Sequence, residues 1–336
     1  MADETTLTVA VVGATSLIGE ELVRLLGERQ VPVGDLRLLG SLRTAGRKVD
    51  EATIALVGPD AFDGVDIAFF AAGPTVASEH VESALRAGAI VVDVSSRFRL
   101  DETIPLVVPE VNAHLLSGPV RPQLVASPSS TAVALSVVLS PLGEASGIRR
   151  VVVSTYQSAA GAGKGAVMRL SKESIDLLSG RGDDADERRT RRAFNCIPQV
   201  GALEPGGATT HELQVVEEVR RVLERPDLAM HVTAARVPMF FGMAASVAVE
   251  FEDALSEEAA LELLRGARGI LVHEDAPDTL PTPADVIGSQ ATHVGRVRSD
   301  PTVGSGIALW VALDSVEKGA ALNAVEIAEI LLRGRT

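Results

Sequence analysis

Residues 8–26 read TVAVVGATSLIGEELVRLL, and this stretch decides the expected fold. Residues 9–12 form a short apolar run bounded by glycine, which is typical of a strand buried on both faces. After the turn from Gly13 to Gly19, apolar residues recur at helical spacing as far as Leu26. A strand, a glycine turn and a helix in this order form a phosphate-binding corner, because the N–H groups of the first helical turn face an anion.

The glycine pattern of this corner is incomplete. Gly13 permits the tight turn and Gly19 permits close packing of the helix on the strand. Ser16 stands where a third glycine often occurs, so the backbone there is less able to approach a pyrophosphate. The stretch alone favours nucleotide binding, with an α/β turn that binds nothing as the alternative.

The second expected strand, residues 36–39, predicts which dinucleotide the corner prefers. An acidic residue near this strand end would bond the ribose 2′-hydroxyl of NAD, but the following GSLRTAG contains none. It contains Ser41 and Arg43, and a guanidinium can pair with a 2′-phosphate. This favours NADP, and the alternative is a solvated basic loop.

Further strand–helix units continue the pattern. Strands are expected at 65–70, 89–94 and 123–126 and a helix at 76–87, which predicts a parallel sheet whose ligands lie beyond the carboxyl ends of its strands. Arg97 and Arg99 lie two apart on a segment expected to be extended, so their side chains would point the same way. They predict an anion pocket, or else a solvated surface pair. Ser129 and Ser130 precede the apolar helix 132–139, where a hydroxyl either caps the helix or acts as a nucleophile at its positive end.

Composition narrows the class of protein. A chain of 336 residues exceeds one ordinary core, so two domains are expected. The net charge of −14 and an aromatic content of 3% argue against nucleic acid and anionic membranes as partners. The single cysteine, Cys196, excludes an internal disulfide and a cysteine zinc cluster, and no metal site is expected. Neither a signal peptide nor a membrane-spanning run is evident, which predicts a cytoplasmic protein.

The second half alternates between strand and helix signals. Several of the expected strands alternate in polarity, which predicts a sheet covered on one face. A charged stretch, residues 180–192, is expected to form a mobile loop. The strands are expected at 151–157, 230–237, 246–251, 270–273, 293–297 and 307–313, and the helices at 164–178, 212–223, 256–264 and, amphipathic, at 320–332.

The chain resembles aspartate-β-semialdehyde dehydrogenases over nearly its whole length. The motifs that carry the resemblance occur in the family's order: VAVVGAT (9–15), SLRTAG (41–46), SSRFR (95–99), PLVVPEVN (105–112), SPSST (127–131), VVVSTYQSAAGAGK (151–164), AFNCIPQ (193–199), RVPMFFG (236–242), PTPAD (281–285), VGRVRSD (294–300) and KGAALNAVEIAE (318–329).

The resemblance implies an α/β fold in two parts. The first is a Rossmann-type parallel-sheet domain at 1–128, completed by a C-terminal helix at 318–336. The second is an α+β substrate-binding and dimerisation domain with a mixed sheet at 129–317. The resemblance also implies a homodimer, NADP (NADPH) as cofactor, a small anionic substrate and a place in amino-acid biosynthesis.

Carried over by motif, the family's cofactor contacts fall at Gly13, Thr15, Ser16, Leu17, Ile18, Gly19, Ser41, Arg43, Thr44, Gly73, Gly161 and Asn323, and its substrate contacts at Arg99, Gln157 and Arg236.

The residues at the family's nucleophile and proton-transfer positions differ in this sequence. The family reacts through a thioester on a cysteine and moves protons with a histidine, and those positions are occupied here by Ser130 and Met243. A serine hydroxyl is a poor nucleophile at neutral pH without a base, and a thioether cannot transfer a proton. The family's substrate-binding glutamate and lysine are also replaced, by His211 and Gln214. Such changes resemble the Usg-type branch, which keeps the fold but lacks the cysteine.

Three functions follow from these departures. The first, which the chemistry favours, is a nucleotide-binding homologue with impaired dehydrogenase activity. The second is an active dehydrogenase that uses Ser130 with an unrecognised base. The third is a reductase of another acyl phosphate.

Overall fold

The computed structural model describes residues 6–29, 31–49, 52–117, 123–181, 188, 190–274, 276 and 278–333. The described parts of 1–129 and 320–336 form one compact unit, and those of 130–319 form a second. None of the helices in the described residues is long and apolar enough to cross a membrane.

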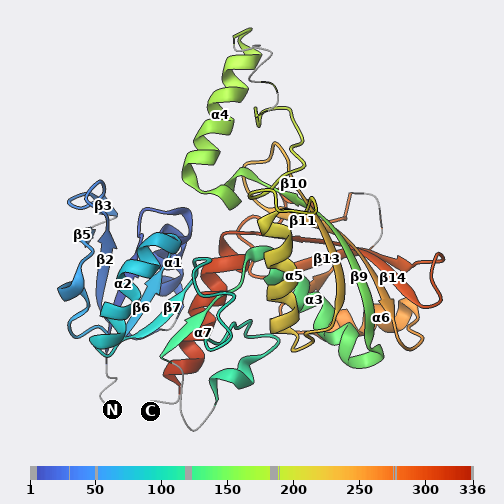
Figure 1. Ribbon diagram of the computed structural model, residues 1–336, viewed down its shortest axis with the longest axis horizontal. Helices are drawn as coiled ribbons and strands as arrows, with labels where there is room; N and C mark the ends of the chain where they lie inside the picture. Colours follow the sequence, from blue (N-terminus) through green and yellow to red (C-terminus); the bar gives the residue numbers. More distant parts are fainter. Residues whose placement is uncertain are drawn as a thin grey trace. The chain divides into compact units, whose positions relative to one another are not determined.

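The first unit is built on a six-stranded, fully parallel sheet in the order β5-β2-β1-β6-β7-β8 (Figure 1). The chain reverses direction across the sheet between β1 and β6, which is the switch point of a dinucleotide-binding fold. The strands are β1 Leu7–Val12, β2 Val33–Gly40, β5 Ala55–Leu56, β6 Ile67–Phe70, β7 Ile90–Asp93 and β8 Leu124–Ala126, with a short hairpin of β3 Lys48–Val49 and β4 Ala52–Thr53 between β2 and β5.

Helices cover both faces of this sheet. Val9 and Val11 of β1 pack in one apolar cluster with α1 and α7, while Ala10 and Val12 pack in another with α2. Alternate residues of one strand are therefore buried on opposite faces, as the continuous apolar run predicted. The helices are α1 Leu17–Glu28, α2 Pro74–Arg86 and α7 Asn323–Leu332, with 3₁₀ turns η1 Pro59–Phe62 and η2 Ala113–Leu116.

The second unit is built on a mixed six-stranded sheet in the order β10-β9-β11-β14-β13-β12. The central strands are antiparallel, and each edge pair is parallel. Helices α3, α5 and α6 pack with the sheet in one apolar cluster. The strands are β9 Ile148–Gln157, β10 Ala229–Arg236, β11 Met243–Phe251, β12 Ile270–Val272, β13 Thr292–Ser299 and β14 Gly306–Leu313, and the helices are α3 Ser130–Ser146, α4 Lys164–Leu178, α5 Thr210–Val222 and α6 Glu257–Gly266, with η3 Ala159–Ala162.

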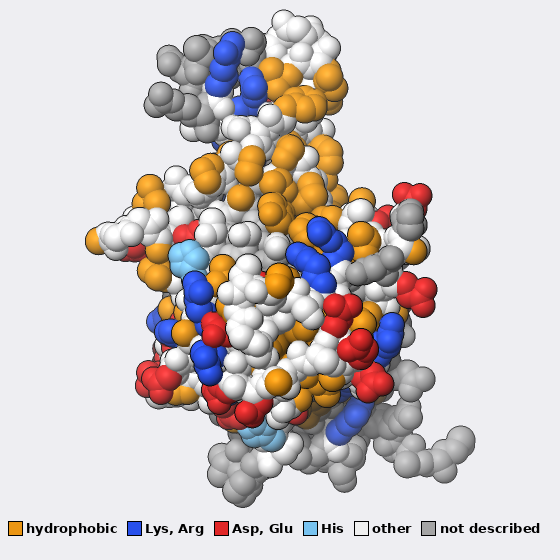
Figure 2. All heavy atoms as spheres, turned by 90° about the vertical axis from the view of Figure 1, so that its right-hand side faces the viewer, with side chains coloured by type: hydrophobic (Ala, Val, Ile, Leu, Met, Phe, Trp, Pro, Cys, Tyr) orange, Lys and Arg blue, Asp and Glu red, His pale blue; other side chains and the backbone are white. Residues whose placement is uncertain are grey.

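The other face of this sheet is only partly covered. Tyr156 is exposed there and lies 5.7 Å from Trp310 between ring centroids, while Thr233 and Ser246 are also exposed. Helix α4 projects away from the sheet (Figure 1), and hydrophobic side chains gather on the surface beneath it (Figure 2). Met168, Ile175 and Leu178 of α4 are exposed as well.

Several expected boundaries shift in the structure. Strand β11 begins at Met243 and not at Ser246, and α3 begins at Ser130 itself. The last helix is not amphipathic as expected, because its residues from Asn323 to Ala328 are all buried and a π-helical turn, η4 Glu317–Leu322, precedes it. Within the charged stretch 180–192, which was expected to form a mobile loop, residues 182–187 and 189 lie outside the described residues.

Candidate functional site

The turn between β1 and α1 has the geometry that its glycines predicted. Gly13 has φ +87°, and a Cβ there would lie 2.8 Å from the backbone of Ala72. A Cβ on Gly19 would lie 2.2 Å from the carbonyl oxygen of Gly13. Gly73, with φ +91°, begins α2 after the neighbouring strand β6, so both glycine turns lie at the carboxyl edge of the switch point. Thr15 is half-buried in the same corner.

Ser16 has a definite role in this corner. Its hydroxyl caps α1 by accepting from the N–H of Gly19 at 2.9 Å, and it donates to the carbonyl of Ala71 at 2.9 Å. The remaining N–H groups of the first turn, on Leu17 and Ile18, meet no acceptor within the described part of the chain. The corner therefore presents two backbone donors and the positive end of a helix to a phosphate.

The loop after β2 forms a compact turn, in which Thr44 and Ala45 both donate their N–H groups to the carbonyl of Ser41 at 2.9 Å. Arg43 lies in this turn with an exposed guanidinium, and no described residue pairs with it. The turn also follows the strand next to β1, so Arg43 lies at the edge where the corner opens. A 2′-phosphate fits a cation at this place.

Asn323, the first residue of α7, is fully buried. Its amide nitrogen donates to the carbonyl of Val107 at 3.0 Å and to the hydroxyl of Ser127 at 2.9 Å. Its oxygen Oδ1 has no hydrogen-bond partner in the described residues. A buried, unsatisfied acceptor is costly, and a bound group that carries an amide N–H would satisfy it.

Arg97 and Arg99 do not share a pocket, which corrects the expectation. The segment is bent rather than extended, and Arg97 bonds Ser78 at 2.7 Å with its guanidinium 4.9 Å from the Phe98 ring centroid. Arg99 instead donates to the carbonyls of Ser127 at 2.9 Å and Val94 at 2.7 Å.

Asp93, which sequence reasoning did not single out, is buried at the carboxyl end of β7. It accepts from the Ser95 hydroxyl at 2.8 Å and the Ser95 N–H at 3.1 Å. Burial raises the pKa of its carboxyl, and the bonds from Ser95 and the charges of Arg99 and Arg97 oppose that rise. The sequence feature that could have identified Asp93 is an acidic residue directly after the apolar residues of an expected strand.

In the second unit, Ser130 is the first residue of α3 and is half-buried. A Cβ on Gly319 would lie 2.5 Å from the Cβ of Ser130, so the backbone of η4 passes directly over this serine. The hydroxyl therefore lies at the positive end of a 17-residue helix, which would stabilise negative charge there.

Met243 fills the neighbouring position with a thioether. It is 1% exposed, and the Thr131 hydroxyl approaches its sulfur at 3.7 Å. Its cross-strand partner is Gln157. The side chain thus packs in the core beside α3, where it has no proton to give and no basic atom to receive one.

Gln157 connects three further side chains and is only 7% exposed. Its Nε2 lies 3.3 Å from the hydroxyls of Thr131 and Thr155 and 2.8 Å from Nε2 of His211. The resemblance placed His211 at the family's substrate-binding glutamate without assigning it a contact, and α5 brings its half-buried imidazole to this cluster. Only the fold shows this, because 54 residues separate the two.

Arg236 lies beside Gln157 as its partner in the parallel pair β9–β10. One terminal nitrogen donates to the carbonyl of Ser158 at 2.5 Å, and a Cβ on Gly161 would lie 3.0 Å from it. Burial, and then the charge of Arg192, lower the pKa of Arg236. Gly161, expected near the cofactor, is thus placed against Arg236, and a bound anion would relieve this desolvated cation.

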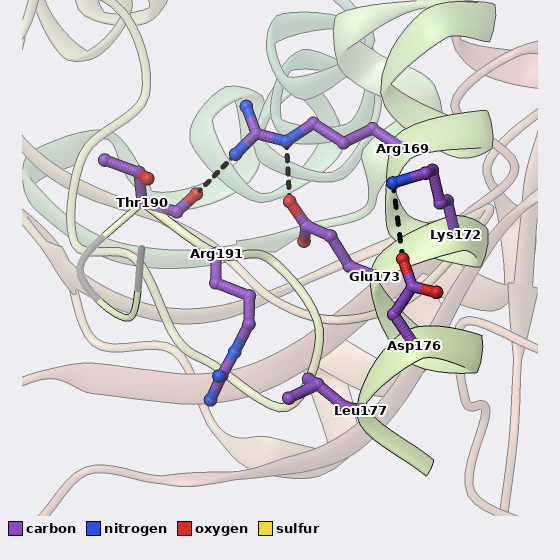
Figure 3. Close-up of a pocket in the computed structure, with 7 residues that line it drawn as sticks. All are labelled: Arg169, Lys172, Glu173, Asp176, Leu177, Thr190 and Arg191. Carbon is purple, nitrogen blue, oxygen red and sulfur yellow. Dashed lines mark hydrogen bonds and ion pairs between the residues drawn. The ribbon is translucent and has the colours of Figure 1, made fainter. Parts of the chain in front are cut away.

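A pocket of about 290 Å³ lies between α4 and the segment around Thr190 (Figure 3). It contains none of the expected site residues. Arg169 donates to Glu173 at 2.6 Å and Lys172 pairs with Asp176 at 3.3 Å, while Glu173 also accepts from the N–H groups of Arg192 and Ala193. These contacts join the chain segment to α4, so we assign the pocket a structural role.

Metal ligands do not gather in the described residues, where no group of three or more His, Cys, Asp or Glu side chains could hold an ion. Cys196 is exposed.

Two family models match the chain. The model described as "Semialdehyde dehydrogenase, NAD binding domain" matches residues 8–118, and "Semialdehyde dehydrogenase, dimerisation domain" matches residues 139–318. Among curated relatives, "Aspartate-semialdehyde dehydrogenase" of Bacillus subtilis is 37% identical over 97% of both chains. "Aspartate-semialdehyde dehydrogenase 2" of Vibrio cholerae is 38% identical, also over 97% of both.

Solved structures agree with these matches. The crystal structure of aspartate semialdehyde dehydrogenase II from Vibrio cholerae superposes with a TM-score of 0.93 at 37% identity, covering 99% of this chain and 100% of that one. A Candida albicans enzyme solved with NADP superposes with a TM-score of 0.74 at 21% identity, covering 98% and 99% respectively, which shows the shared fold.

Proposed function

The chain belongs to the aspartate-semialdehyde dehydrogenase family and contains its NAD(P)-binding domain, and we propose that it is an NADP-binding member in which the dehydrogenase reaction is impaired. This proposal places it in the Usg-type branch. The observation that carries it is the buried thioether of Met243 at the family's proton-transfer position.

Impairment follows from the first chemical step. The reaction needs a nucleophile that adds to the aldehyde carbon, and a serine hydroxyl is not ionised near neutral pH. The positive end of α3 would favour an alkoxide at Ser130, but Met243 cannot remove the proton. General acid–base assistance is worth about a hundredfold to ten-thousandfold in rate, so its loss alone removes ordinary turnover.

Retention of NADP rests on features of the first unit. Leu17 and Ile18 would donate backbone N–H groups to the pyrophosphate, Arg43 would pair with the 2′-phosphate, and Oδ1 of Asn323 would accept from the carboxamide. When bound, the nicotinamide supplies or accepts a hydride. Within the first unit, Gly13, Thr15, Ser16, Gly19, Ser41, Thr44 and Gly73 complete the proposed contacts.

The proposed ligand of the second unit is a small anion. Arg236 and Gln157 are neighbours on adjacent strands and would orient a carboxylate. Arg99 is a separate proposed anion contact of the first unit.

We also propose a homodimer, built on the domain that the family model describes as a dimerisation domain. The partly covered sheet face with Tyr156 and Trp310 supports it, because a second copy would bury these aromatic rings. The division into domains at 1–128 with 318–336 and at 129–317 belongs to the same proposal, and a cytoplasmic location stays a prediction.

A second candidate function is favoured by His211. Its imidazole lies beside Gln157, and Gln157 is the cross-strand partner of Met243. A titratable side chain therefore lies one residue away from the position at which the family has its proton-transferring histidine. In this alternative, Ser130 is a working nucleophile and His211 is its base, in an active aspartate-semialdehyde dehydrogenase or related acyl-phosphate reductase.

One pair of measurements separates the two candidates. Titration with NADPH tests the cofactor site, and an assay with aspartate semialdehyde, phosphate and NADP tests the reaction. The main proposal expects binding without ordinary turnover. Turnover near 10 per second that is lost in His211→Gln would establish the alternative.

A further inference from the structure

A chain of hydrogen bonds that none of the proposed roles uses lies at the edge of the second unit's sheet. His293 on β13 has its Nε2 2.6 Å from the hydroxyl oxygen of Ser289 and its Nδ1 2.8 Å from Nε2 of His273. His273 follows β12, and its Nδ1 lies 3.0 Å from the carbonyl oxygen of Thr279. The two imidazole centroids are 5.1 Å apart.

The carbonyl of Thr279 determines which atom donates and which accepts in each of these hydrogen bonds. A carbonyl oxygen only accepts, so Nδ1 of His273 carries a proton and, in the neutral ring, its Nε2 is an acceptor. Nδ1 of His293 must then donate to it, which leaves Nε2 of His293 as a basic lone pair. That lone pair faces the Ser289 hydroxyl.

The surroundings of the serine agree with this direction. The N–H of Ala291 donates to the Ser289 oxygen at 3.3 Å, so the hydroxyl proton is left for His293. Ser289 is half-buried and His293 is 7% exposed. Burial, and then the charge of His273, lower the pKa of His293 against the opposing charge of Asp285, so its imidazole is the neutral, basic form near pH 7.

We propose that Ser289, His293 and His273 form a nucleophilic triad, in which Ser289 accepts an acyl group from small activated esters. A nucleophile, a base within hydrogen-bond reach and a third group that orients the base are the parts such chemistry requires. His293 is the catalytic base, and His273 is a positioning residue that fixes its tautomer.

The step balances within these residues and the ester. The Ser289 oxygen bonds to the carbonyl carbon, its proton passes to Nε2 of His293, and the C–O bond to the alcohol breaks as that proton moves to the leaving oxygen. Water then releases the acyl group as a carboxylic acid. Neither a metal nor a redox partner is needed, and none of the residues assigned to the dehydrogenase site takes part.

The test uses a fluorophosphonate probe on the full-length protein, with adducts located by mass spectrometry of peptides. Attack forms a bond from the Ser289 oxygen to phosphorus and expels fluoride. We expect an adduct on Ser289, absent in Ser289→Ala, and a labelling rate about a hundredfold lower in His293→Gln. Two control variants should label as the wild type does. Ser140→Ala removes a half-buried serine of α3, and His231→Gln removes an exposed histidine of β10.

His273 is tested by replacement and rescue. His273→Phe should slow labelling because Nδ1 of His293 loses its acceptor, while His273→Glu should restore much of the rate because a carboxylate accepts the same proton. Thermal melts of each variant show that the fold is retained. No adduct on Ser289 in folded wild-type protein, or labelling unchanged in folded His293→Gln, would overturn the triad.

Discussion

The first unit's nucleotide corner and the second unit's reaction cluster differ in what each retains. The corner contains two glycine turns with positive φ, the Ser16 cap and an exposed Arg43. The cluster contains Gln157 and Arg236 on neighbouring strands, but the buried Met243 stands at the proposed proton-transfer position. Binding depends on backbone geometry built into the whole turn, whereas covalent chemistry depends on two side-chain atoms. Covalent chemistry can therefore be lost while nucleotide binding is kept.

The largest expected effect comes from rebuilding the cluster. Ser130→Cys combined with Met243→His should raise semialdehyde dehydrogenase turnover by about a hundredfold or more, because a nucleophile and its base are restored together. Steady-state assay with NADP and phosphate measures this gain. Each single variant serves as its control and should recover little, since one of the two groups is still missing. A folded double variant no faster than the wild type would show that the framework is not preserved.

A smaller effect is expected in the corner. Arg43→Ala should weaken NADP binding by about tenfold to a hundredfold and leave NAD binding nearly unchanged, because a charge-assisted contact contributes about 1.5–3 kcal/mol. Calorimetric titration of both nucleotides provides the comparison. Arg47→Ala removes another exposed arginine nearby and should change neither affinity. Equal loss in the two variants would mean that net charge, and not the 2′-phosphate contact, governs binding.

The two units also offer matched helix caps. Ser16 caps α1 in the corner, and Ser256 caps α6 in the second unit by accepting from the N–H of Ala259 at 3.2 Å. Replacing either serine by alanine should lower the free energy of unfolding by about 1 kcal/mol, as measured by urea titration. Only Ser16→Ala should also weaken nucleotide binding. Equal nucleotide affinity in both variants would count against a phosphate at α1.

The smallest expected effect is an opposite response of the two units to acid. Hydrogen bonds from Ala234 and Thr209 outweigh burial and lower the pKa of Glu212. Its contribution to stability is present above the unfolded pKa, about 4.3, and is lost as pH falls through the lower folded pKa. The raised pKa of Asp93 acts the other way: its contribution is present below the unfolded value, about 3.9, and is lost as pH rises through the folded pKa.

Hydrogen exchange, corrected for intrinsic pH dependence, resolves this contrast. Lowering the pH from 5 toward 3 should reduce protection around Glu212 in the wild type, and Glu212→Gln should remove that dependence. Asp93→Asn should leave protection in β7 insensitive to pH, while the wild type becomes better protected there as pH falls. A uniform response of both segments would contradict the assigned pKa directions.

The sequence predicted strands β1, β6, β7 and β8 of the parallel sheet closely, because each is an apolar run that ends in a glycine or polar turn. It missed the start of β2, where Asp35 and Arg37 interrupt the apolar run, and it missed the two-residue strand β5. The family resemblance implied the mixed sheet, and the glycine spacing predicted the corner around Gly13. The boundary of β11 was missed, since Met243 and the two alanines after it have no alternation that marks a strand.

Contacts between distant side chains could not be predicted in the same way. His211 meets Gln157 only because α5 packs beside β9 and β10, and no local pattern encodes this. The bent segment that separates Arg97 from Arg99 reflects contacts with Ser78 and Ser127. The sequence did not single out Ser289 or His293, because the tautomer that makes His293 a base depends on the distant carbonyl of Thr279.

The carboxylate of Glu212 joins the two elements that carry His211 and Arg236. Glu212 completes the cap of α5 by accepting from the N–H of Thr209 at 2.7 Å, and its other oxygen accepts from the N–H of Ala234 on β10 at 2.7 Å. His211 is adjacent to this carboxylate, and Arg236 lies two residues beyond Ala234 on the same strand. The imidazole and the guanidinium are therefore linked through a single carboxylate, and we expect their microsecond motions to be correlated.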